Sequence, residues 1–375
     1  MPGLRPDIDP DGLQEFSVVF TDRSLNHMSA KFQGVMRDIS EMLREVYGAA
    51  AVALVPGGGS YAMEAVARQF GAGRQVLIVR NGWFSNRWSQ IFEAGGFVAG
   101  TTVVMARASG NGAQAAFAPP PIDEVVAKIL EVRPDVVFAP HVETSAGLIL
   151  PDDYIAAMAA AAHEVGALLV LDCIASGCVW VDMQATGVDV LISAPQKGWS
   201  ASPSAGMVML SARAEARLAE TASDSFALDL KKWRSIMAAY EAGGHAYHAT
   251  MPTDALLGLR DAMAETRALG LAEMKAAQWA LGRAVRAMLA EKGVVSVAAE
   301  GFGAPGVVVS FTDDPEVQNG KKFLAEGLQI AAGVPLQVGE GAAFRTFRLG
   351  LFGLDKLVDV PGTVARLQAA VDRVL

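Results

Sequence analysis

Cysteine is scarce in this sequence. Only Cys173 and Cys178 occur among its 375 residues, and both stand in an apolar context. Two cysteines cannot build a disulfide-stabilised scaffold or supply a four-ligand zinc pattern. The histidines His245 and His248 have no metal-ligand spacing with other ligands. We therefore expect no metal site, and we expect Cys173 to pack as a small hydrophobic residue.

Long uninterrupted apolar runs are also missing. Glycine, proline or a charged residue breaks each apolar stretch well before the roughly 18 residues that a membrane-spanning helix needs. Residues 1–7 (MPGLRPD) lack the apolar core of a secretory signal. The 40 acidic residues outnumber the 31 basic ones, and the net charge of −9 disfavours nucleic acid as a partner. The sequence therefore predicts a soluble, cytoplasmic protein that acts on small molecules and does not bind membranes.

Apolar residues are abundant, at 52% of the chain, and can form a sizeable core. Short apolar runs alternate with segments of helical periodicity, which predicts an α/β fold with a largely parallel sheet covered by helices. The predicted strands of this sheet are residues 51–55, 75–79, 98–105, 135–140, 168–171, 188–192 and 205–210.

The pattern changes after about residue 255. A long helical stretch over residues 253–291, broken near Gly270, is followed by two strand candidates, 294–297 and 306–310, and a final helix over 364–375. We therefore predict three parts of the chain. These are an N-terminal arm (1–20), a large domain (21–265) and a small C-terminal α+β domain (266–375).

An acid and a lysine follow two of the predicted strands. Asp172 ends the run 168–171, and Lys197 follows the run 188–192. Because the carboxyl ends of parallel strands meet at one edge of a sheet, both side chains are expected where ligands bind in such folds. A lysine that forms a Schiff base and a carboxylate that keeps a pyridine nitrogen protonated suit pyridoxal phosphate. A buried Asp–Lys ion pair explains these two residues equally well.

A glycine-rich turn, residues 56–61 (PGGGSY), joins a predicted strand to a predicted helix. Glycines let the main chain approach an anion, and the N–H groups at a helix start bind phosphate. The turn differs from the Walker pattern because no Gly-Lys-Ser/Thr follows it. A dinucleotide site stays open, since Ala62 can occupy the last position of that pattern. An ordinary strand-to-helix turn is the alternative without a ligand.

Five motifs, in this order along the chain, resemble those of the class V aminotransferases. They are residues 57–65 (GGGSYAMEA), 81–87 (NGWFSNR), 141–147 (HVETSAG), 171–176 (LDCIAS) and 193–197 (SAPQK). The branch most similar is that of the alanine–, serine– and ureidoglycine–glyoxylate aminotransferases, and the resemblance covers nearly the whole chain from about Phe20. It implies fold type I of the pyridoxal-phosphate enzymes, with a seven-stranded type of sheet, and a homodimer with active sites at the subunit interface.

The resemblance also implies roles for single residues. Lys197 is the Schiff-base lysine, Asp172 is the partner of the pyridine nitrogen, and Ser145 hydrogen-bonds the pyridine hydroxyl. The residues implied to contact the cofactor phosphate are Gly59, Ser60, Tyr61 and Gln196.

An aromatic ring is expected to stack on the cofactor. Phe84 stands where the family usually has that aromatic residue, although its neighbour Trp83 competes for the role. Packing in the core is the alternative for either ring. For His141, a contact with the cofactor and a hydrogen bond within the core are equally plausible.

Two later segments complete the implied site. Tyr247 and Thr250, in residues 247–252 (YHATMP), resemble the residues that reach the phosphate of the other subunit, although Thr250 could instead cap the following helix. Arg348 resembles the arginine that holds the substrate carboxylate, since a guanidinium matches a carboxylate in a bidentate way. Arg345 is a nearby competitor, and we favour Arg348.

The implied activity is a ping-pong transamination. A small amino acid such as alanine or serine donates the amino group, and glyoxylate or pyruvate accepts it. Gly198, Trp199 and residues 20–23 (FTDR) depart from the family pattern, so the substrates stay open. Residues 143–144 are also similar to those of 2-aminoethylphosphonate–pyruvate aminotransferases. A lyase on the same scaffold is a further alternative, and a non-catalytic metabolite-binding protein is disfavoured by Lys197.

Overall fold

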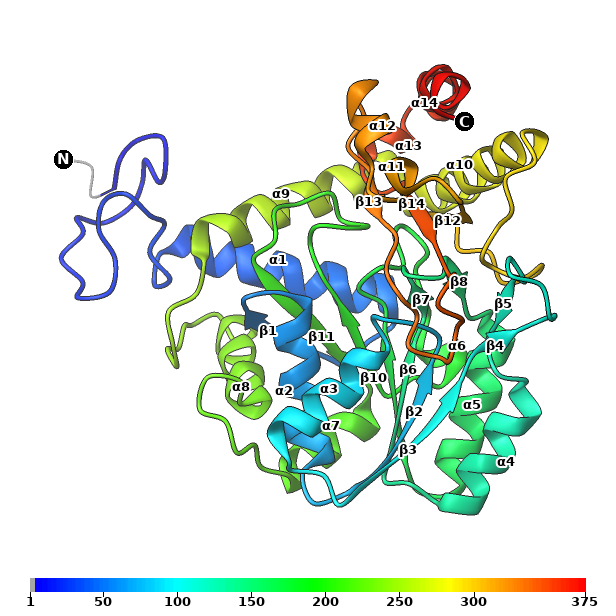
Figure 1. The fold of residues 1–375 in the computed structure, drawn as a ribbon. Coiled ribbons are helices and arrows are strands. Elements are labelled where there is room, and N and C mark those ends of the chain that lie inside the picture. The colour runs from blue at the N-terminus through cyan, green and yellow to red at the C-terminus, as the bar shows by residue number, and fades with distance from the viewer. Residues whose placement is uncertain (1–3) are drawn as a thin grey trace.

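The computed structural model describes residues 4–375, so the first three residues of the predicted arm lie outside the described part. Residues 4–29 contain no helix or strand, and Figure 1 shows them as a loop that projects from the body of the molecule. The first helix, α1 (Ala30–Tyr47), begins after Ser29, whose side chain caps it, and ends at Gly48. Glycine suits this end because its φ of 66° lies in the left-handed region.

A seven-stranded sheet forms the centre of the molecule (Figure 1). In spatial order its strands are β1 (Ala51–Pro56), β11 (Ala205–Leu210), β10 (Val190–Ser193), β9 (Leu168–Asp172), β6 (Val136–Pro140), β2 (Gln75–Arg80) and β3 (Gly100–Met105). Strand β11 is antiparallel to both of its neighbours, whereas the other neighbouring strands are parallel. The predicted, mostly parallel α/β sheet is therefore confirmed.

Helices cover the sheet, which explains why its central strands are apolar at successive positions. Every residue of β6, β9, β10 and β11 is buried. The covering helices include α2 (Gly59–Gly71), α3 (Asn86–Gly95), α4 (Ile122–Val132), α5 (Asp152–Glu164), α6 (Met183–Thr186), α7 (Ala212–Glu220) and α8 (Leu230–Glu241).

The carboxyl ends of β1, β2, β6, β9 and β10 lie at one edge of this sheet, because these strands run in the same direction. The turn after β1 leads into α2, and residues 81–85 lead from β2 into α3. Strand β6 is followed by the short strands β7 (Val142–Glu143) and β8 (Leu148–Ile149). The edge thus gathers the segments that carry the sequence motifs.

The C-terminal part contains a second, three-stranded sheet (Figure 1). Helices α9 (Thr253–Leu269) and α10 (Leu271–Glu291) lead into it and meet at Gly270, as the sequence predicted. Its strands, in spatial order, are β12 (Val307–Phe311), β14 (Thr346–Gly350) and β13 (Ala331–Ala332). The accompanying helices are α11 (Pro315–Gln318), α12 (Lys321–Ala325), α13 (Leu354–Leu357) and α14 (Val360–Val374).

One predicted strand is wrong. Residues 294–297 form no strand, and only Ser296 makes an isolated bridge, to Ser310 of β12. The segment nevertheless lies beside β12, because Val297 N–H donates to the Val309 carbonyl at 3.0 Å and Phe311 N–H donates to the Val295 carbonyl at 2.9 Å. The remaining short strands, β4 (Arg107–Ala108) and β5 (Phe117–Ala118), pair with each other.

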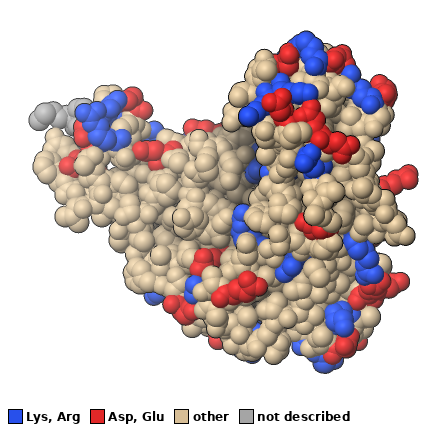
Figure 2. Space-filling model, in the orientation of Figure 1, with Lys and Arg blue, Asp and Glu red and all other residues tan. Residues whose placement is uncertain are grey.

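Across residues 4–375, no helix is both long and apolar enough to cross a membrane. On the face shown in Figure 2, acidic and basic side chains are interspersed, and the surface is hollowed between the projecting N-terminal part and the C-terminal lobe.

Candidate active site

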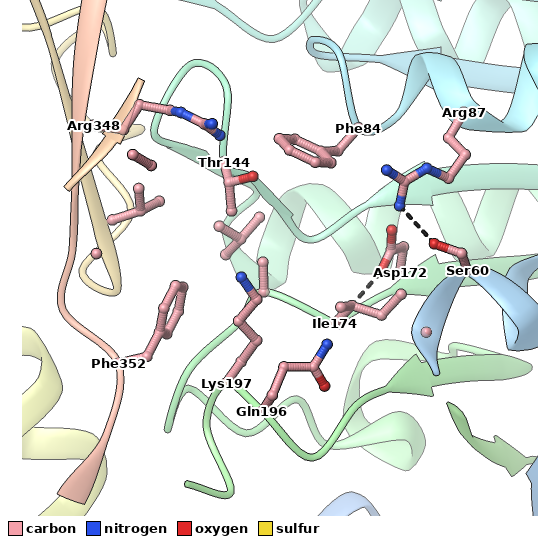
Figure 3. Close-up of a pocket in the computed structure, with 16 residues that line it drawn as sticks. Ser60, Phe84, Arg87, Thr144, Asp172, Ile174, Gln196, Lys197, Arg348 and Phe352 are labelled. Atoms are coloured by element: carbon pink, nitrogen blue, oxygen red, sulfur yellow. Dashed lines mark hydrogen bonds between the residues drawn. The ribbon is translucent and has the colours of Figure 1, made fainter. Parts of the chain in front are cut away.

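A cavity of about 400 Å³ opens between the carboxyl edge of the central sheet and the three-stranded sheet. Both sheets contribute to its wall, and Figure 3 shows their side chains converging on it. The predicted site residues that line it are Gly59, Ser60, Phe84, Asp172, Gln196, Lys197 and Arg348. Residues from four of the five motifs and from the segment of Arg348 therefore meet in one place.

Asp172 is a buried carboxylate with few protein partners. It ends β9, and its Oδ1 accepts the Ile174 N–H at 2.9 Å. Burial raises its pKa to about 7, the Ile174 N–H opposes this rise, and the nearby Glu143 adds to it. A cationic N–H group placed in the cavity would return this carboxyl to its charged form.

Lys197 lies in the loop after β10, and its Nζ is 5.0 Å from the centre of the Phe352 ring. Burial and the nearby Arg348 lower the pKa of the amine. Asp172 and Lys197 line the same cavity but form no salt bridge with each other. The reading of these residues as a buried ion pair is therefore wrong.

The main chain beyond Lys197 is tightly packed. A Cβ on Gly198 would lie 2.1 Å from the carbonyl oxygen of Gly177, so only glycine fits there. Trp199 is buried, and its ring centre lies 4.6 Å from that of Trp180. The two residues after the lysine that depart from the family pattern thus anchor its loop.

Glu143 fixes residues 81–85 at the other side of the cavity. Its carboxylate accepts the N–H groups of Phe84 at 3.2 Å and Ser85 at 2.9 Å, and the hydroxyls of Ser85 and Ser145 at 2.7 Å. A Cβ on Gly82 would lie 2.2 Å from Ser145 Oγ, so the main chain approaches too closely for any other residue. This network holds Phe84 in the cavity wall.

Arg348 reaches the cavity from β14. Its Nε donates to the Ala332 carbonyl of β13 at 2.8 Å, and its guanidinium carbon lies 5.6 Å from the centre of the Phe84 ring. The competitor Arg345 donates instead to the Asp313 carbonyl at 2.7 Å and is absent from the cavity wall. The geometry therefore favours Arg348 as the cation that faces a ligand.

The model of one protein family, aminotransferase class-V, matches residues 14–340. The chain belongs to the class-V aminotransferase family. Enzymes of this family are pyridoxal-phosphate-dependent aminotransferases, which agrees with the resemblance seen in the sequence.

Individual relatives of this class-V aminotransferase have different names. The small subunit of a soluble hydrogenase from Synechococcus sp. is 26% identical, over 92% of this chain and 87% of its own. Alanine–glyoxylate aminotransferase 1 of Saccharomyces cerevisiae is 25% identical, over 88% and 86%. The 2-aminoethylphosphonate–pyruvate transaminase of Burkholderia thailandensis is 32% identical, over 60% and 57%.

A solved structure also resembles this chain. The alanine–glyoxylate aminotransferase from Nostoc sp. has a TM-score of 0.79 at 24% identity, over 93% of this chain and 89% of its own. This likeness shows the fold, which is fold type I of the pyridoxal-phosphate enzymes.

The cavity of the class-V aminotransferase fits the family's cofactor on three observations. The Asp172 carboxyl is buried and suits a cationic ring nitrogen, and the Lys197 amine has no acidic partner within residues 4–375. A Cβ on Gly59 would lie 2.5 Å from Ile174 Cδ1, so the glycine leaves room beside the start of α2. In Figure 3, Phe84 lies above and Ile174 below the level of the Asp172 carboxylate.

Four predicted residues lie outside the cavity wall. The Ser145 hydroxyl is buried, donates to Glu143 and accepts the Trp83 N–H at 2.9 Å. The Tyr61 ring is 55% exposed, and its N–H donates to the Gly58 carbonyl at 3.0 Å.

The other two, Tyr247 and Thr250, are bonded to each other at 3.0 Å in an exposed segment. Of the two aromatic candidates for stacking, Phe84 lines the cavity and Trp83 does not. His141 also lies outside the wall, and its Nδ1 is 2.7 Å from Ser176 Oγ. Burial lowers the pKa of His141 to about 3, so the ring is neutral and belongs to the core.

Sequence reasoning missed several residues of the cavity wall, among them Arg87, Thr144, Ile174 and Phe352. Arg87, Thr144 and Ile174 stand within quoted motifs, so their position next to predicted residues was an available signal. Phe352 follows β14 and carried no such signal.

Proposed function

We propose that this protein transfers the amino group of a small amino acid, of the alanine or serine type, to glyoxylate or pyruvate, with pyridoxal phosphate as cofactor. The proposal rests chiefly on one observation. Asp172, Lys197 and Arg348, which come from three separate segments, line a single cavity. The relative named alanine–glyoxylate aminotransferase supports the choice of substrates. The mechanism proposed is ping-pong, so that the product of the donor leaves before the acceptor binds.

The cofactor would be held by both ends. Lys197 would attach to it covalently, and Asp172 would bind its ring nitrogen. Main-chain N–H groups of Gly59, Ser60 and Tyr61, together with the Gln196 side chain, bind its phosphate. Those of Gly59 and Ser60 have no main-chain acceptor within residues 4–375, which supports their role more strongly than that of Tyr61. Bound pyridoxal phosphate supplies an electron sink for the bond broken at the substrate α-carbon.

Lys197 is the proposed acid–base residue. Its lowered pKa makes the neutral amine more available, so Nζ, when it is not bonded to the cofactor, would take the proton from the α-carbon of the donor. Asp172, with one hydrogen bond from the protein, keeps the ring nitrogen protonated. Phe84 would stack on the cofactor ring. Ser145 stays a proposed partner of the pyridine hydroxyl, although its hydroxyl is already bonded to Glu143.

Arg348 would bind the substrate carboxylate. Its bond to the Ala332 carbonyl uses Nε and leaves the two terminal nitrogens available for a bidentate contact. Val307, Ala331 and Gly350 line the cavity beside it, and these small residues suit a compact, uncharged substrate side chain.

We propose that two copies of the chain form the active enzyme. Tyr247 and Thr250 are exposed and away from the cavity of their own chain, which suits contact with the cofactor phosphate in the partner subunit. The N-terminal loop exposes Leu13, Phe16 and Val18 to 88%, 87% and 102%, and apolar side chains of this kind are normally covered by a partner.

Absorption spectroscopy tests the proposal. The purified protein reconstituted with pyridoxal phosphate should show a visible absorption band that the variant Lys197→Ala lacks. Alanine should bleach the band, and glyoxylate should restore it. If the wild type shows no more of this band than Lys197→Ala, the proposed cofactor chemistry is wrong.

A second candidate function is 2-aminoethylphosphonate–pyruvate transamination. It is favoured by the Burkholderia thailandensis relative and by residues 143–144. A panel of alanine, serine and 2-aminoethylphosphonate, each with glyoxylate and with pyruvate, separates the two candidates by the donor that turns over fastest. Ammonia released without any 2-oxo acid would instead show a lyase on the same scaffold.

A further inference from the structure

The cavity carries an excess of positive charge. Its wall includes Arg87, Lys197 and Arg348, whereas Asp172 is the one acidic residue among the described residues that line it. Within residues 4–375, none of the three cations forms a salt bridge. The proposed function uses Lys197 and Arg348 and leaves Arg87 without a role.

Arg87 and Arg348 approach the cavity from opposite ends. In Figure 3, Arg87 enters beside Ser60 and Asp172, whereas Arg348 enters from the opposite side of the view. Their guanidinium carbons lie 5.3 and 5.6 Å from the centre of the same Phe84 ring. Such an arrangement suits a ligand assembly with two separated anionic groups.

Arg87 is attached to the start of α2 through a side-chain contact. Its Nη1 donates to Ser60 Oγ at 2.9 Å, and Ser60 is the second residue of α2. The main-chain N–H groups of Gly59 and Ser60 are free of main-chain acceptors within the described residues. A helix start carries a partial positive charge, and the guanidinium adds a full one at the same place.

The main chain just before Arg87 is held in place by hydrogen bonds to Glu143. Arg87 stands in the first turn of α3, directly after the segment whose N–H groups Glu143 holds. The Phe84 ring on which its guanidinium lies is held by the same network. The chain therefore presents Arg87 on a fixed main chain, which reduces the entropy lost when its side chain contacts a ligand.

We infer that Arg87 is the cationic ligand of the cofactor phosphate and sets the preference for the phosphorylated over the unphosphorylated cofactor. This inference rests on the proposed function. The other phosphate contacts proposed are neutral donors, so Arg87 provides the formal positive charge that a dianionic phosphate group requires at that end. Arg348 then remains free for the substrate carboxylate at the opposite end.

A comparison of two cofactor forms distinguishes phosphate binding by Arg87 from other roles of this residue. Pyridoxal lacks the phosphate of pyridoxal phosphate but shares its ring and aldehyde. The dissociation constants of both are measured on the cofactor-free protein, from the visible absorption band and from quenching of tryptophan fluorescence. For Arg87→Gln, we expect binding of pyridoxal phosphate to weaken by about 10- to 100-fold, the range for loss of one charged hydrogen bond, and binding of pyridoxal to change little.

Control variants complete the experiment. Arg87→Lys keeps the charge and should recover part of the preference, whereas Arg348→Gln should leave the ratio of the two dissociation constants at its wild-type value. Inorganic phosphate should compete with pyridoxal phosphate for the wild type and less well for Arg87→Gln.

Two outcomes overturn the inference. The first is an unchanged ratio in Arg87→Gln, which with an equal loss for both cofactor forms would indicate an effect on Asp172 or on folding. The second is an equal change of the ratio in Arg348→Gln. A wild-type protein that binds neither form would instead overturn the proposed function itself.

Discussion

Two buried carboxylates beside the cavity differ sharply in how the protein uses them. Glu143 receives hydrogen bonds from Phe84, Ser85 and Ser145, through main-chain N–H groups of all three and hydroxyls of two. Asp172 receives one, from the Ile174 N–H. Asp172 ends β9 and Glu143 follows β6 at the same edge of the sheet, and both are less than one tenth exposed.

The difference distinguishes a carboxylate whose hydrogen bonds hold neighbouring segments in place from one that is left with few protein partners. Protein donors satisfy Glu143, so its charge stabilises the segment that carries Phe84 and Arg87. The charged form of Asp172 is left destabilised, since burial removes water and one N–H replaces little of it. We infer that the protein keeps Asp172 for a partner that the chain itself does not provide.

The largest expected effect comes from replacing Asp172. Asp172→Asn keeps the shape but cannot hold a ring nitrogen in its protonated form, so we expect the turnover of alanine with glyoxylate to fall by about a thousandfold. The cofactor-free variant should be as stable as the wild type or more so, because an unfavourable buried charge is removed. Steady-state kinetics and thermal unfolding measure the two effects. A variant with normal turnover would remove Asp172 from the proposed mechanism.

Replacing Glu143 should produce the opposite pattern. Glu143→Ala leaves several buried donors without acceptors, so we expect the free energy of unfolding to fall by about 3 kcal/mol. Chemical denaturation of the cofactor-free protein measures the change, and Ser145→Ala, which removes one donor, should lose less. Equal stability of Glu143→Ala and the wild type would contradict the structural role.

The pH dependence of stability should also report on Asp172. The pKa of Asp172 is about 7 in the folded protein against 3.8 for an ordinary aspartate, so the folded state holds this proton more tightly. The stabilisation by this proton is complete below about pH 4 and is lost as the pH rises to about 7.

The cofactor-free wild type should therefore lose stability relative to Asp172→Asn over that range, and the two should run parallel above it. Denaturation curves at a series of pH values measure the difference. A constant difference from pH 4 to pH 8 would show that folding does not raise the pKa of Asp172.

The smallest effects are expected from a pair of glycines. A methyl group on Gly59 would push the flexible end of Ile174, which lines the cavity, so Gly59→Ala should weaken cofactor binding by about tenfold with little change in stability. A methyl group on Gly82 would instead meet Ser145 Oγ and the Glu143 side chain, so Gly82→Ala should lower stability by about 1–2 kcal/mol. Titration with pyridoxal phosphate and chemical denaturation distinguish the two variants. The same response in both variants would contradict the expectation that Gly59 affects cofactor binding whereas Gly82 affects stability.

The sequence predicted the features that depend on local pattern. Buried parallel strands are continuous apolar runs, so the sheet and the positions of Asp172 and Lys197 at its carboxyl edge followed from periodicity. That Phe84 rather than Trp83 lines the cavity could not be derived this way. It depends on hydrogen bonds that the N–H groups of Trp83 and Phe84 donate to Ser145 and Glu143, which lie about sixty residues further along the chain. Side-chain contacts between distant segments leave no periodic trace.

Other differences have equally specific causes. Residues 294–297 satisfied the strand pattern and do pair with β12, but the pairing stops at the single bridge of Ser296 and does not extend into a strand. Ser145 was expected to face the cavity, but the structure directs its hydroxyl to Glu143. The roles of Tyr247 and Thr250 depend on a second subunit and stay predictions, as do the domain boundaries.

The packing behind Lys197 has a consequence for its motion. Gly198 is pressed against the main chain of Gly177, and Trp199 is wedged beside Trp180, so the peptide that carries the lysine has little room to shift. The amine can therefore move only by rotation about the bonds of its own side chain, while the Cα of Lys197 stays in place. The reach of this side chain, and not a loop movement, therefore determines which substrate atoms the Lys197 amine can contact.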